Sequence, residues 1–292
     1  MTSGSAYKNA VTQRLAQRAR VLGLDPNVLL KRLAFQRILA RLALDERWVL
    51  KGGFVMELRL GLAARTTKDL DLVLRDEGTR WTAQTVQDLI DEALDVDLDD
   101  RMTFEVRVPK AVVVDGVAGS TWGVSVRVLL DGTELCVVRL DVVTRAVDMG
   151  ETRDALRVDP VLPGLEGCGP VTVAAVDPAQ HAAEKLHACV RTYAHDRPSS
   201  RDKDLVDLVL LEEAGLVDRR ALGVALDRVF RVRDGEAPPA TLPALPVGWR
   251  SPYEAKAEEM ELTARSFDDA VRAVTVMYED ALHGLDDERK DG

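Results

Sequence analysis

The sequence predicts an α+β fold, in which a small mixed sheet with flanking helices is followed by a mainly helical C-terminal domain. Residues 104–143 are rich in valine and alternate apolar with polar positions, and Asp131-Gly132 interrupts them as a β-hairpin turn would. From about residue 176 the apolar positions recur at helical spacing instead. Glycine and proline cluster over residues 150–175, so we expect a core domain over 1–160 and the helical domain over 161–292.

The same periodicities define the individual elements. Alternating aspartate and leucine at the start of 69–74 predicts a strand with one polar face. Asp25-Pro26 predicts a helix start, because proline suits the first helical turn. The expected strands are 48–50, 69–74, 104–114, 122–130 and 134–143. The expected helices are 7–22, 26–44, 54–60, 82–95, 178–193, 203–213 and 218–230, with one or two more over 253–284.

The bulk composition is that of a soluble globular protein. The chain has 292 residues, of which 46% are hydrophobic and 30% are charged. No run of 18 apolar residues occurs and residues 1–10 are polar, so we expect a cytoplasmic protein with neither a membrane span nor a secretory signal. Three widely spaced cysteines, Cys136, Cys168 and Cys189, form no zinc-type or disulfide pattern.

Charge is unevenly distributed along the chain. The net charge of −10 argues against a protein that coats nucleic acid. Residues 1–47 nevertheless hold nine lysines and arginines against three acidic residues. This asymmetry permits a local basic surface that meets phosphate, although ordinary solvated helix faces explain it equally well.

The first candidate for chemistry is the pair Asp69 and Asp71. Because these residues are two apart on a strand, their carboxylates project from the same face. Carboxylates held so close repel each other unless a cation lies between them, and Mg²⁺ takes one or two carboxylates together with water and substrate phosphate. Taken alone, the pair also fits the solvated face of an edge strand.

A glycine turn and a third carboxylate add to this pair. Lys51-Gly52-Gly53 lies between a short apolar strand and a helix, where paired glycines let the backbone approach a phosphate and the helix N-terminus supplies free N–H groups. A tight turn without a ligand would use the same residues. Asp141, in a valine-rich strand, could complete a metal site or act as a general base, and a purely structural role is the alternative.

The helical half contributes Lys185 and, further on, Asp204 and Asp207, which share a helix face because they are three residues apart. Lys185 could reach a triphosphate as a point charge, and Asp207 could hold the lysine or touch the nucleotide. A surface ion pair of little energetic value is the alternative. For His187 we favour a structural role, because no histidine or cysteine spacing suggests a metal site.

These pieces, in this order, resemble the AbiEii/AbiGii-type nucleotidyltransferase toxins. The resemblance covers about residues 45–215 and rests on Lys51-Gly52-Gly53, Leu58-Arg59, Arg65-Thr66-Thr67-Lys68-Asp69-Leu70-Asp71, Lys185-Leu186-His187-Ala188 and Lys203-Asp204-Leu205-Val206-Asp207-Leu208. Such proteins are the toxins of type IV-class toxin–antitoxin and phage-defence systems, and the mycobacterial MenT toxins belong among them. The resemblance implies a polymerase-β-like core that uses Mg²⁺ and a nucleoside triphosphate. It also implies a cognate antitoxin and transfer of nucleotides to the 3′ acceptor end of tRNA, which stops translation.

Carried over residue by residue, the resemblance implies roles for individual side chains. Asp69, Asp71 and Asp141 would hold the metal, and Lys185 and Asp207 would complete the catalytic set. The nucleotide-binding residues would be Lys51, Gly52, Gly53, Arg65, Thr66, Thr67 and Lys185. From their charge, Arg191, Arg197 and Arg201 are candidates for holding an acceptor stem by its phosphates.

One residue departs from the family pattern. Phe54 stands where a small or hydroxyl residue commonly follows the glycine pair, so a hydroxyl contact to phosphate is lost. Triphosphate binding would then depend on the Gly52-Gly53 backbone, on Thr66 or Thr67, and on Lys185. Two other functions stay open: nucleotidylation of a protein or small molecule by the same core, and a low-turnover binding module that keeps the fold to engage a partner.

Overall fold

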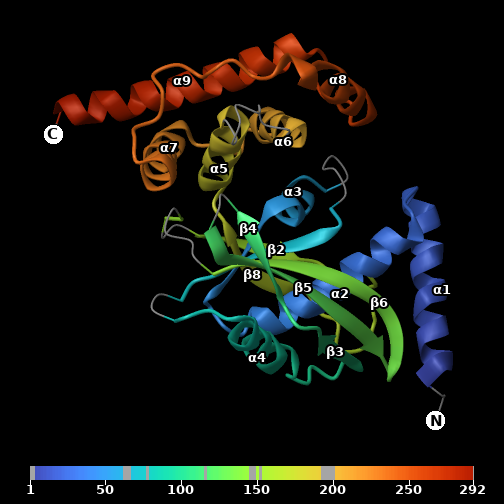
Figure 1. Cartoon of the computed structure of the whole chain (residues 1–292). Helices are drawn as coiled ribbons and strands as arrows, with labels where there is room; N and C mark the ends of the chain where they lie inside the picture. Colours follow the sequence, from blue (N-terminus) through green and yellow to red (C-terminus); the bar gives the residue numbers. More distant parts are fainter. Residues whose placement is uncertain are drawn as a thin grey trace. The chain divides into compact units, whose positions relative to one another are not determined.

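The structure of the chain is a computed structural model that describes residues 4–61, 67–76, 79–114, 117–144, 149–150, 153–191 and 201–291 (Figure 1). The chain divides into two compact units. The first comprises Met1–Arg59, Thr66–Ala146 and Asp154–Ala175, and the second comprises Leu60–Arg65, Val147–Arg153 and Val176–Gly292. A mixed sheet with helices and a helical C-terminal region are both present, which confirms the predicted α+β class.

One sheet organises the first unit. Among the described residues its strands follow the order β3-β5-β6-β2-β1-β8-β7, and β4 also pairs with β5. The pairs β2/β6 and β1/β8 are parallel, whereas β1/β2 and the pairs made by β5 are antiparallel. The strands are β1 (Trp48–Lys51), β2 (Asp69–Leu74), β3 (Met102–Val106), β4 (Lys110–Val114), β5 (Val117–Leu130), β6 (Thr133–Val143), β7 (Arg153–Val158) and β8 (Val171–Val176).

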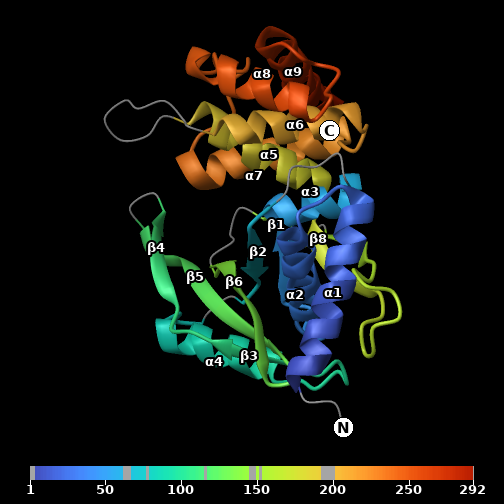
Figure 2. The ribbon, with the colours of Figure 1, turned by 90° about the vertical axis from the view of Figure 1, so that its right-hand side faces the viewer.

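Helices cover one face of this sheet. α1 (Gly4–Leu22) and α2 (Pro26–Leu42) run side by side (Figure 2), and α1 buries an apolar stripe made by Val11, Leu15 and Ala19. α2 contacts β6, and α4 (Ala83–Leu94) contacts both α2 and β3. α3 (Gly52–Leu60) follows β1 directly, so the chain passes from strand to helix at Gly52 without an intervening loop.

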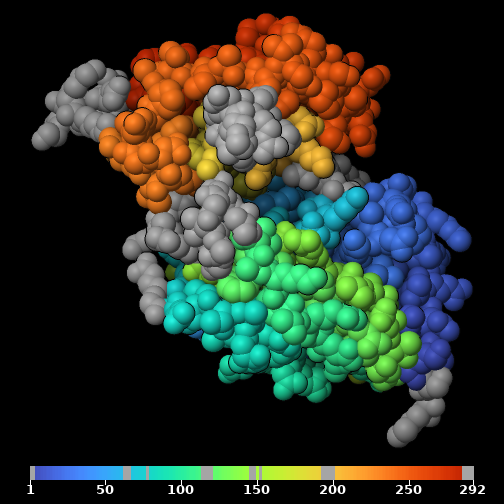
Figure 3. Space-filling model, viewed as in Figure 1, coloured from blue at the N-terminus to red at the C-terminus, as the bar shows by residue number. Residues whose placement is uncertain are grey.

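Alternation along β5 and β6 separates a buried sheet face from a polar one. Val124 and Leu140 are fully buried, whereas Gly123, Arg139 and Asp141 on the opposite face are not. The green and lime segments that contain these strands reach the molecular surface in Figure 3. Because a one-residue slip in register would exchange the two faces, the buried valines and leucines fix which face carries the polar side chains.

A buried ion cluster ties the segment before β3 to α2. Asp100 accepts a hydrogen bond from Arg37 Nε at 2.7 Å and bonds from both terminal nitrogens of Arg41 at 2.9 Å. Burial alone would raise the pKa of the Asp100 carboxyl, but hydrogen bonds from Arg41, from the Met102 backbone and from Arg37 outweigh burial and lower that pKa. The cluster therefore holds the carboxylate in its charged form.

The strands differ from prediction in three places, the first being that β5 begins at Val117 instead of at residue 122. The expected strand 104–114 is in fact two strands, β3 and β4, which pair with different halves of β5. Pro109 lies between them and has no N–H to donate to a ladder, so the run breaks there. The sequence pattern does not predict β7 and β8, because glycine and proline surround them. β8 pairs with β1 through Leu50 and Ala175.

The second unit is built from helices. They are α5 (Pro178–Val190), α6 (Asp202–Glu213), α7 (Arg219–Asp234), α8 (Arg250–Glu259) and α9 (Phe267–Asp291), with a 3₁₀ turn over Val247–Trp249. α9 packs against α6 and α7, and the Tyr278 hydroxyl donates to the Pro239 carbonyl at 2.6 Å, which holds the proline-rich segment against this helix. Within the described residues, every helix is too short or too polar to span a membrane.

Candidate active site

Strand pairing brings the predicted carboxylates onto one sheet face. In the parallel pair β2/β6, Asp71 lies opposite Asp141 and Asp69 lies opposite Arg139. In the antiparallel pair β1/β2, Lys51 lies opposite Asp71. Residues directly opposite each other on neighbouring strands point to the same side of a sheet, so all five side chains belong to the polar face. We call Asp69, Asp71 and Asp141 the carboxylate row.

Gly52 brings the backbone turn into contact with this row. Its φ of +68° lies in the left-handed region, which favours glycine. A Cβ at this position would also collide with the Asp71 carboxylate. The turn from β1 into α3 therefore requires glycine for two independent reasons, and it places the start of α3 beside Asp71.

Arg139 is a positive charge on the acidic face, and the residues predicted for the site do not include it. Its Nε donates to Oδ1 of Asp141 at 2.9 Å. This hydrogen bond raises the pKa of the Arg139 guanidinium, and the negative charges of Asp141, Asp69 and Asp71 add to the effect. The signal was available, because a residue two positions before Asp141 on a strand must share its face.

The donor chemistry of the carboxylate row fits a hard divalent cation. Mg²⁺ prefers carboxylate oxygens and needs only one or two of them from the protein, and these three come from adjacent strands. As they stand, however, no three histidine, cysteine, aspartate or glutamate side chains in the described part of the chain form a group that could hold a metal ion. Asp141 is instead bonded to Arg139.

Glu57 of α3 organises the approach to β2. The residue is 6% exposed. Its carboxylate accepts a hydrogen bond from Arg32 Nε at 2.8 Å and a short hydrogen bond from the backbone N–H of Thr67. The Thr67 hydroxyl donates to the backbone carbonyl of Asp69 at 3.3 Å. Glu57 thus links α3 to the residues just before the carboxylate row. The other two predicted nucleotide-binding residues of this segment, Arg65 and Thr66, lie outside the described residues.

Phe54, the departure from the family pattern, is a core residue. Its side chain is 3% exposed and packs edge-on against Phe35 of α2, with ring centroids 5.3 Å apart. Position 54 therefore faces the hydrophobic core, whereas Gly52 faces Asp71. The neighbouring Gly53 is buried as well.

Lys185 lies in the second unit, in a buried three-residue ion cluster. Its Nζ donates to Asp204 Oδ1 at 2.8 Å and to Asp207 Oδ2 at 2.7 Å. Burial alone would lower the pKa of the ammonium, but the charges of Asp207 and Asp204 outweigh burial and raise it. The structure thus brings Lys185 and Asp207 together and adds Asp204, which is not among the predicted site residues. It is no surface pair, since the lysine side chain is only 8% exposed.

The remaining predicted residues are basic. Arg191 caps the C-terminus of α5, and Arg201 precedes α6 with its Nη1 3.6 Å from Asp204 Oδ2. Arg197 lies outside the described residues. His187 is buried against Phe230 and shares a 2.9 Å hydrogen bond between its Nε2 and Asp234, and burial lowers its pKa. These contacts agree with a structural histidine.

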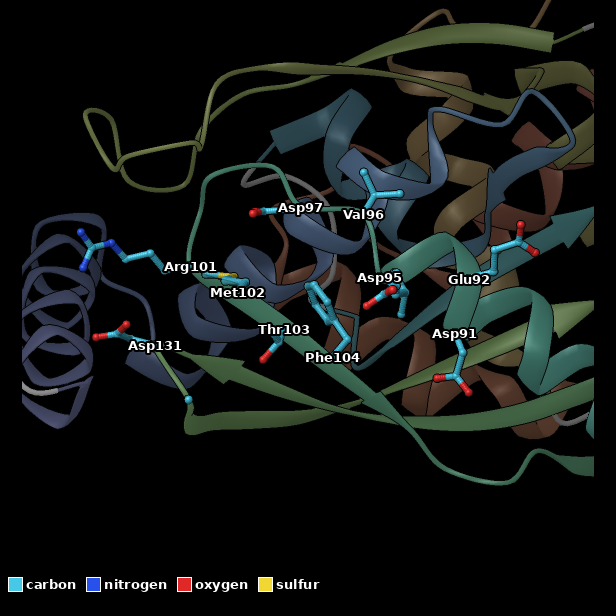
Figure 4. Close-up of a pocket in the computed structure, with 12 residues that line it drawn as sticks. Asp91, Glu92, Asp95, Val96, Asp97, Arg101, Met102, Thr103, Phe104 and Asp131 are labelled. Carbon is cyan, nitrogen blue, oxygen red and sulfur yellow. The ribbon is translucent and has the colours of Figure 1, made fainter.

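A cavity of about 660 Å³ lies between α4 and β3, and it contains none of the predicted site residues (Figure 4). Phe104 and Met102 supply apolar surface there. Its rim is acidic, with Asp91, Glu92, Asp95, Asp97 and Asp131. This charge is of the wrong sign to receive a triphosphate.

Comparisons with known proteins identify a family and a fold. A family model described as "Nucleotidyl transferase AbiEii toxin, Type IV TA system" matches residues 34–273. The solved structure of MenT4, a nucleotidyltransferase toxin from Mycobacterium tuberculosis, has 22% identity and a TM-score of 0.54, with 94% of this chain and 89% of that chain covered. No curated protein matches the chain. The likeness to MenT4 shows a shared nucleotidyltransferase fold.

Two more distant structures are similar as well. A nucleotidyltransferase candidate from H. pylori has 17% identity and a TM-score of 0.46, over 90% of this chain and 98% of that chain. An antigenic nucleotidyltransferase-like protein from Paracoccidioides brasiliensis has 17% identity and a TM-score of 0.35, over 80% and 91% of the two chains. Likenesses at this level carry no functional argument.

Proposed function

This chain belongs to the AbiEii family of nucleotidyltransferase toxins of type IV toxin–antitoxin systems, and we propose that it transfers nucleotides from a nucleoside triphosphate to an RNA 3′ end. In this proposal the acceptor is the tRNA acceptor stem, the reaction depends on Mg²⁺, and its consequence is inhibition of translation. Membership of a toxin–antitoxin family also implies an antitoxin partner and a nucleoside triphosphate substrate.

The carboxylate row carries the proposal. Asp71 lies directly opposite Asp141, Asp69 shares their face, and the Gly52 turn brings a helix start to the same place. Helix starts and exposed backbone N–H groups suit phosphate, and grouped carboxylates suit the cation that accompanies it. A solvated edge strand would explain the aspartates but would not explain a glycine held against one of them.

Each residue has a distinct part in the proposed transfer. The RNA 3′-hydroxyl oxygen bonds to the α-phosphorus, the bond from that phosphorus to the bridging oxygen breaks, and pyrophosphate leaves with the bonding electrons. Asp69, Asp71 and Asp141 would hold Mg²⁺, which when bound supplies charge stabilisation to the phosphates. Asp141 would also orient the hydroxyl or accept its proton.

The substrate-binding residues are part of the same proposal. Lys51, Gly52 and Gly53, with Thr67 and the undescribed Arg65 and Thr66, would bind the triphosphate. Lys185 and Asp207 are proposed members of the catalytic set, as the family resemblance implies. Arg191, Arg197 and Arg201 would bind acceptor-stem phosphates, which predicts transfer that weakens steeply as salt is raised.

The decisive experiment offers each labelled nucleoside triphosphate to the purified protein with total tRNA, with lysate protein, or with no acceptor. We expect label at the tRNA 3′ end, lost on chelation of Mg²⁺ and lost in Asp69→Ala. Glu92→Ala removes an exposed carboxylate from the acidic cavity of the same unit and should keep full incorporation.

The outcomes separate the competing functions. Label in protein or in a small molecule would move the acceptor away from RNA while keeping the chemistry. Incorporation in no arm, together with tight capture of a defined partner, would favour the binding module. A folded Asp69→Ala variant that incorporates nucleotide like the wild type would refute the assignment of the carboxylate row.

A further inference from the structure

Arg139 occupies a position on the acidic face that the proposed reaction leaves without a role. It lies opposite Asp69 in the β2/β6 ladder, and its Nε bonds Asp141 at 2.9 Å. Asp71 is the direct partner of Asp141 in the same ladder. One guanidinium therefore sits among the three carboxylates that are proposed to share a metal ion.

The sheet leaves room for this guanidinium. Gly123 of β5 lies opposite Asp141 on the other side, and a Cβ added there would come within 3.0 Å of Arg139 Nη2. A side chain at position 123 would therefore press on the guanidinium. Arg139 itself is 53% exposed, so it can leave the sheet without disturbing the core.

Charge balance gives the arginine a function. Three carboxylates on two adjacent strands repel one another when no cation is present. Arg139 supplies one positive charge that is bonded directly to Asp141, the residue opposite Asp71. A half-exposed pair of this kind is weak, so a divalent cation can exchange with it at small cost.

We propose that Arg139 is a positioning residue that acts as the resident counter-ion of the carboxylate row, holding Asp141 until a divalent cation displaces its guanidinium. The inference rests on the proposed function in assigning the cation to these three aspartates. It predicts that cation and arginine compete for Asp141, so removing the arginine should tighten cation binding and weaken the cation-free fold.

The test measures Mn²⁺ binding to the full chain by calorimetry, without nucleotide, in the wild type, Arg139→Gln and Arg139→Lys. We expect Arg139→Gln to bind Mn²⁺ more tightly, on the order of fivefold. Arg139→Lys keeps the charge and should bind like the wild type. In EDTA, Arg139→Gln should melt at a lower temperature than the wild type, and Mn²⁺ should remove that difference.

Arg127→Gln is the matched control. Arg127, on β5, lies on the same face of the sheet as Arg139, but it pairs with Glu105 and Glu134 instead of the carboxylate row. Its loss should therefore leave the Mn²⁺ affinity unchanged. The inference is overturned if Arg139→Gln binds Mn²⁺ as tightly as the wild type or more weakly. It is also overturned if neither the wild type nor Arg139→Gln binds Mn²⁺. Nucleotide incorporation by the wild type, measured separately, then decides whether the proposed function fails with it.

Discussion

Asp71 of β2 and Asp141 of β6 are direct partners in a parallel ladder, and this pairing places two carboxylates on neighbouring strands of one polar sheet face. Neighbouring strands lie roughly 4.8 Å apart, a spacing that one bound cation can bridge. The register that pairs them is fixed from the opposite face by the buried side chains of Leu70, Leu72 and Leu140. The chemistry on one face thus depends on the packing of the other.

Gly52→Ala should abolish nucleotide incorporation while leaving most of the fold intact. Alanine resists the left-handed φ of +68°, and its Cβ would collide with the Asp71 carboxylate. We expect a loss of about 1–3 kcal/mol in the free energy of unfolding from the strained backbone. Incorporation assays and urea unfolding at neutral pH measure the two effects.

Gly23→Ala separates strain from contact. Gly23 has nearly the same φ, +66°, but nothing lies within 4 Å of an added Cβ. This variant should lose about 1–2 kcal/mol of stability and keep its incorporation rate. If Gly52→Ala behaved like Gly23→Ala in both assays, contact between the glycine turn and Asp71 would have no part in activity.

Phe54→Ser restores the residue type that commonly follows the glycine pair in the family, yet it should not improve nucleotide binding. The Phe54 ring is buried against Phe35, so the shorter side chain leaves a cavity in the core. Removal of a buried phenylalanine side chain costs about 3–5 kcal/mol. Thermal melts with and without nucleoside triphosphate test this. A larger nucleotide-induced shift in Phe54→Ser than in the wild type would contradict it.

Lys185→Met should destabilise the second unit strongly. It leaves the carboxylates of Asp204 and Asp207 in a buried position without their cation, a change that costs about 3–5 kcal/mol. The folded pKa of Lys185 is raised above its unfolded value, so its stabilisation is complete below about pH 10 and is lost as pH rises through the folded pKa. Urea unfolding between pH 7 and pH 11 should show the onset of this decline above about pH 10 in the wild type alone.

Lys203→Met is the control for the lysine experiment. Lys203 is exposed on the same helix as Asp204, so its loss should change the free energy of unfolding by less than about 0.5 kcal/mol. A Lys185→Met protein as stable as Lys203→Met would show that the buried cluster does not hold the helices together. Lost incorporation in such a stable variant would instead assign Lys185 a purely catalytic part.

The sequence predicts elements well where periodicity and packing agree. β2 spans the predicted residues, and the Asp131-Gly132 turn has φ values of 51° and 75°, as a type I′ hairpin requires. β8 is not predicted, because a six-residue apolar strand between a glycine-rich segment and Asp177-Pro178 carries no period of its own. Its pairing with β1 on one side and β7 on the other identifies it as a strand.

The candidate site is predictable in part for the same reason. The spacing of Asp69 and Asp71 along one strand predicts that they share a face. The partners of Asp141 depend on the register between strands, which the sequence does not reveal. Asp204 lies next to Lys185 only because two helices pack together. Alternation along the strand is enough to predict that Arg139 shares the face of Asp141. A search for acidic ligands alone misses it.

Asp100→Asn should weaken the first unit in a pH-dependent way. Loss of the charge leaves the guanidiniums of Arg37 and Arg41 buried without an anion, at a cost of about 3–5 kcal/mol. The folded pKa of Asp100 is lowered, so its stabilisation is present above the unfolded value near pH 3.9 and is lost as pH falls through the folded pKa. The gap in unfolding free energy between wild type and variant should therefore be constant from about pH 5 to pH 8 and shrink below about pH 4.

Asp159→Asn is the matched control for that experiment. Asp159 pairs with Arg157 at 2.7 Å, but both side chains are more than half exposed, so solvent screens the pair. Its replacement should leave the free energy of unfolding nearly unchanged at every pH from 3 to 8. If the gap for Asp100→Asn stayed constant down to pH 3, or if it were as small as that for Asp159→Asn, the buried cluster would not be what fastens the segment before β3 to α2.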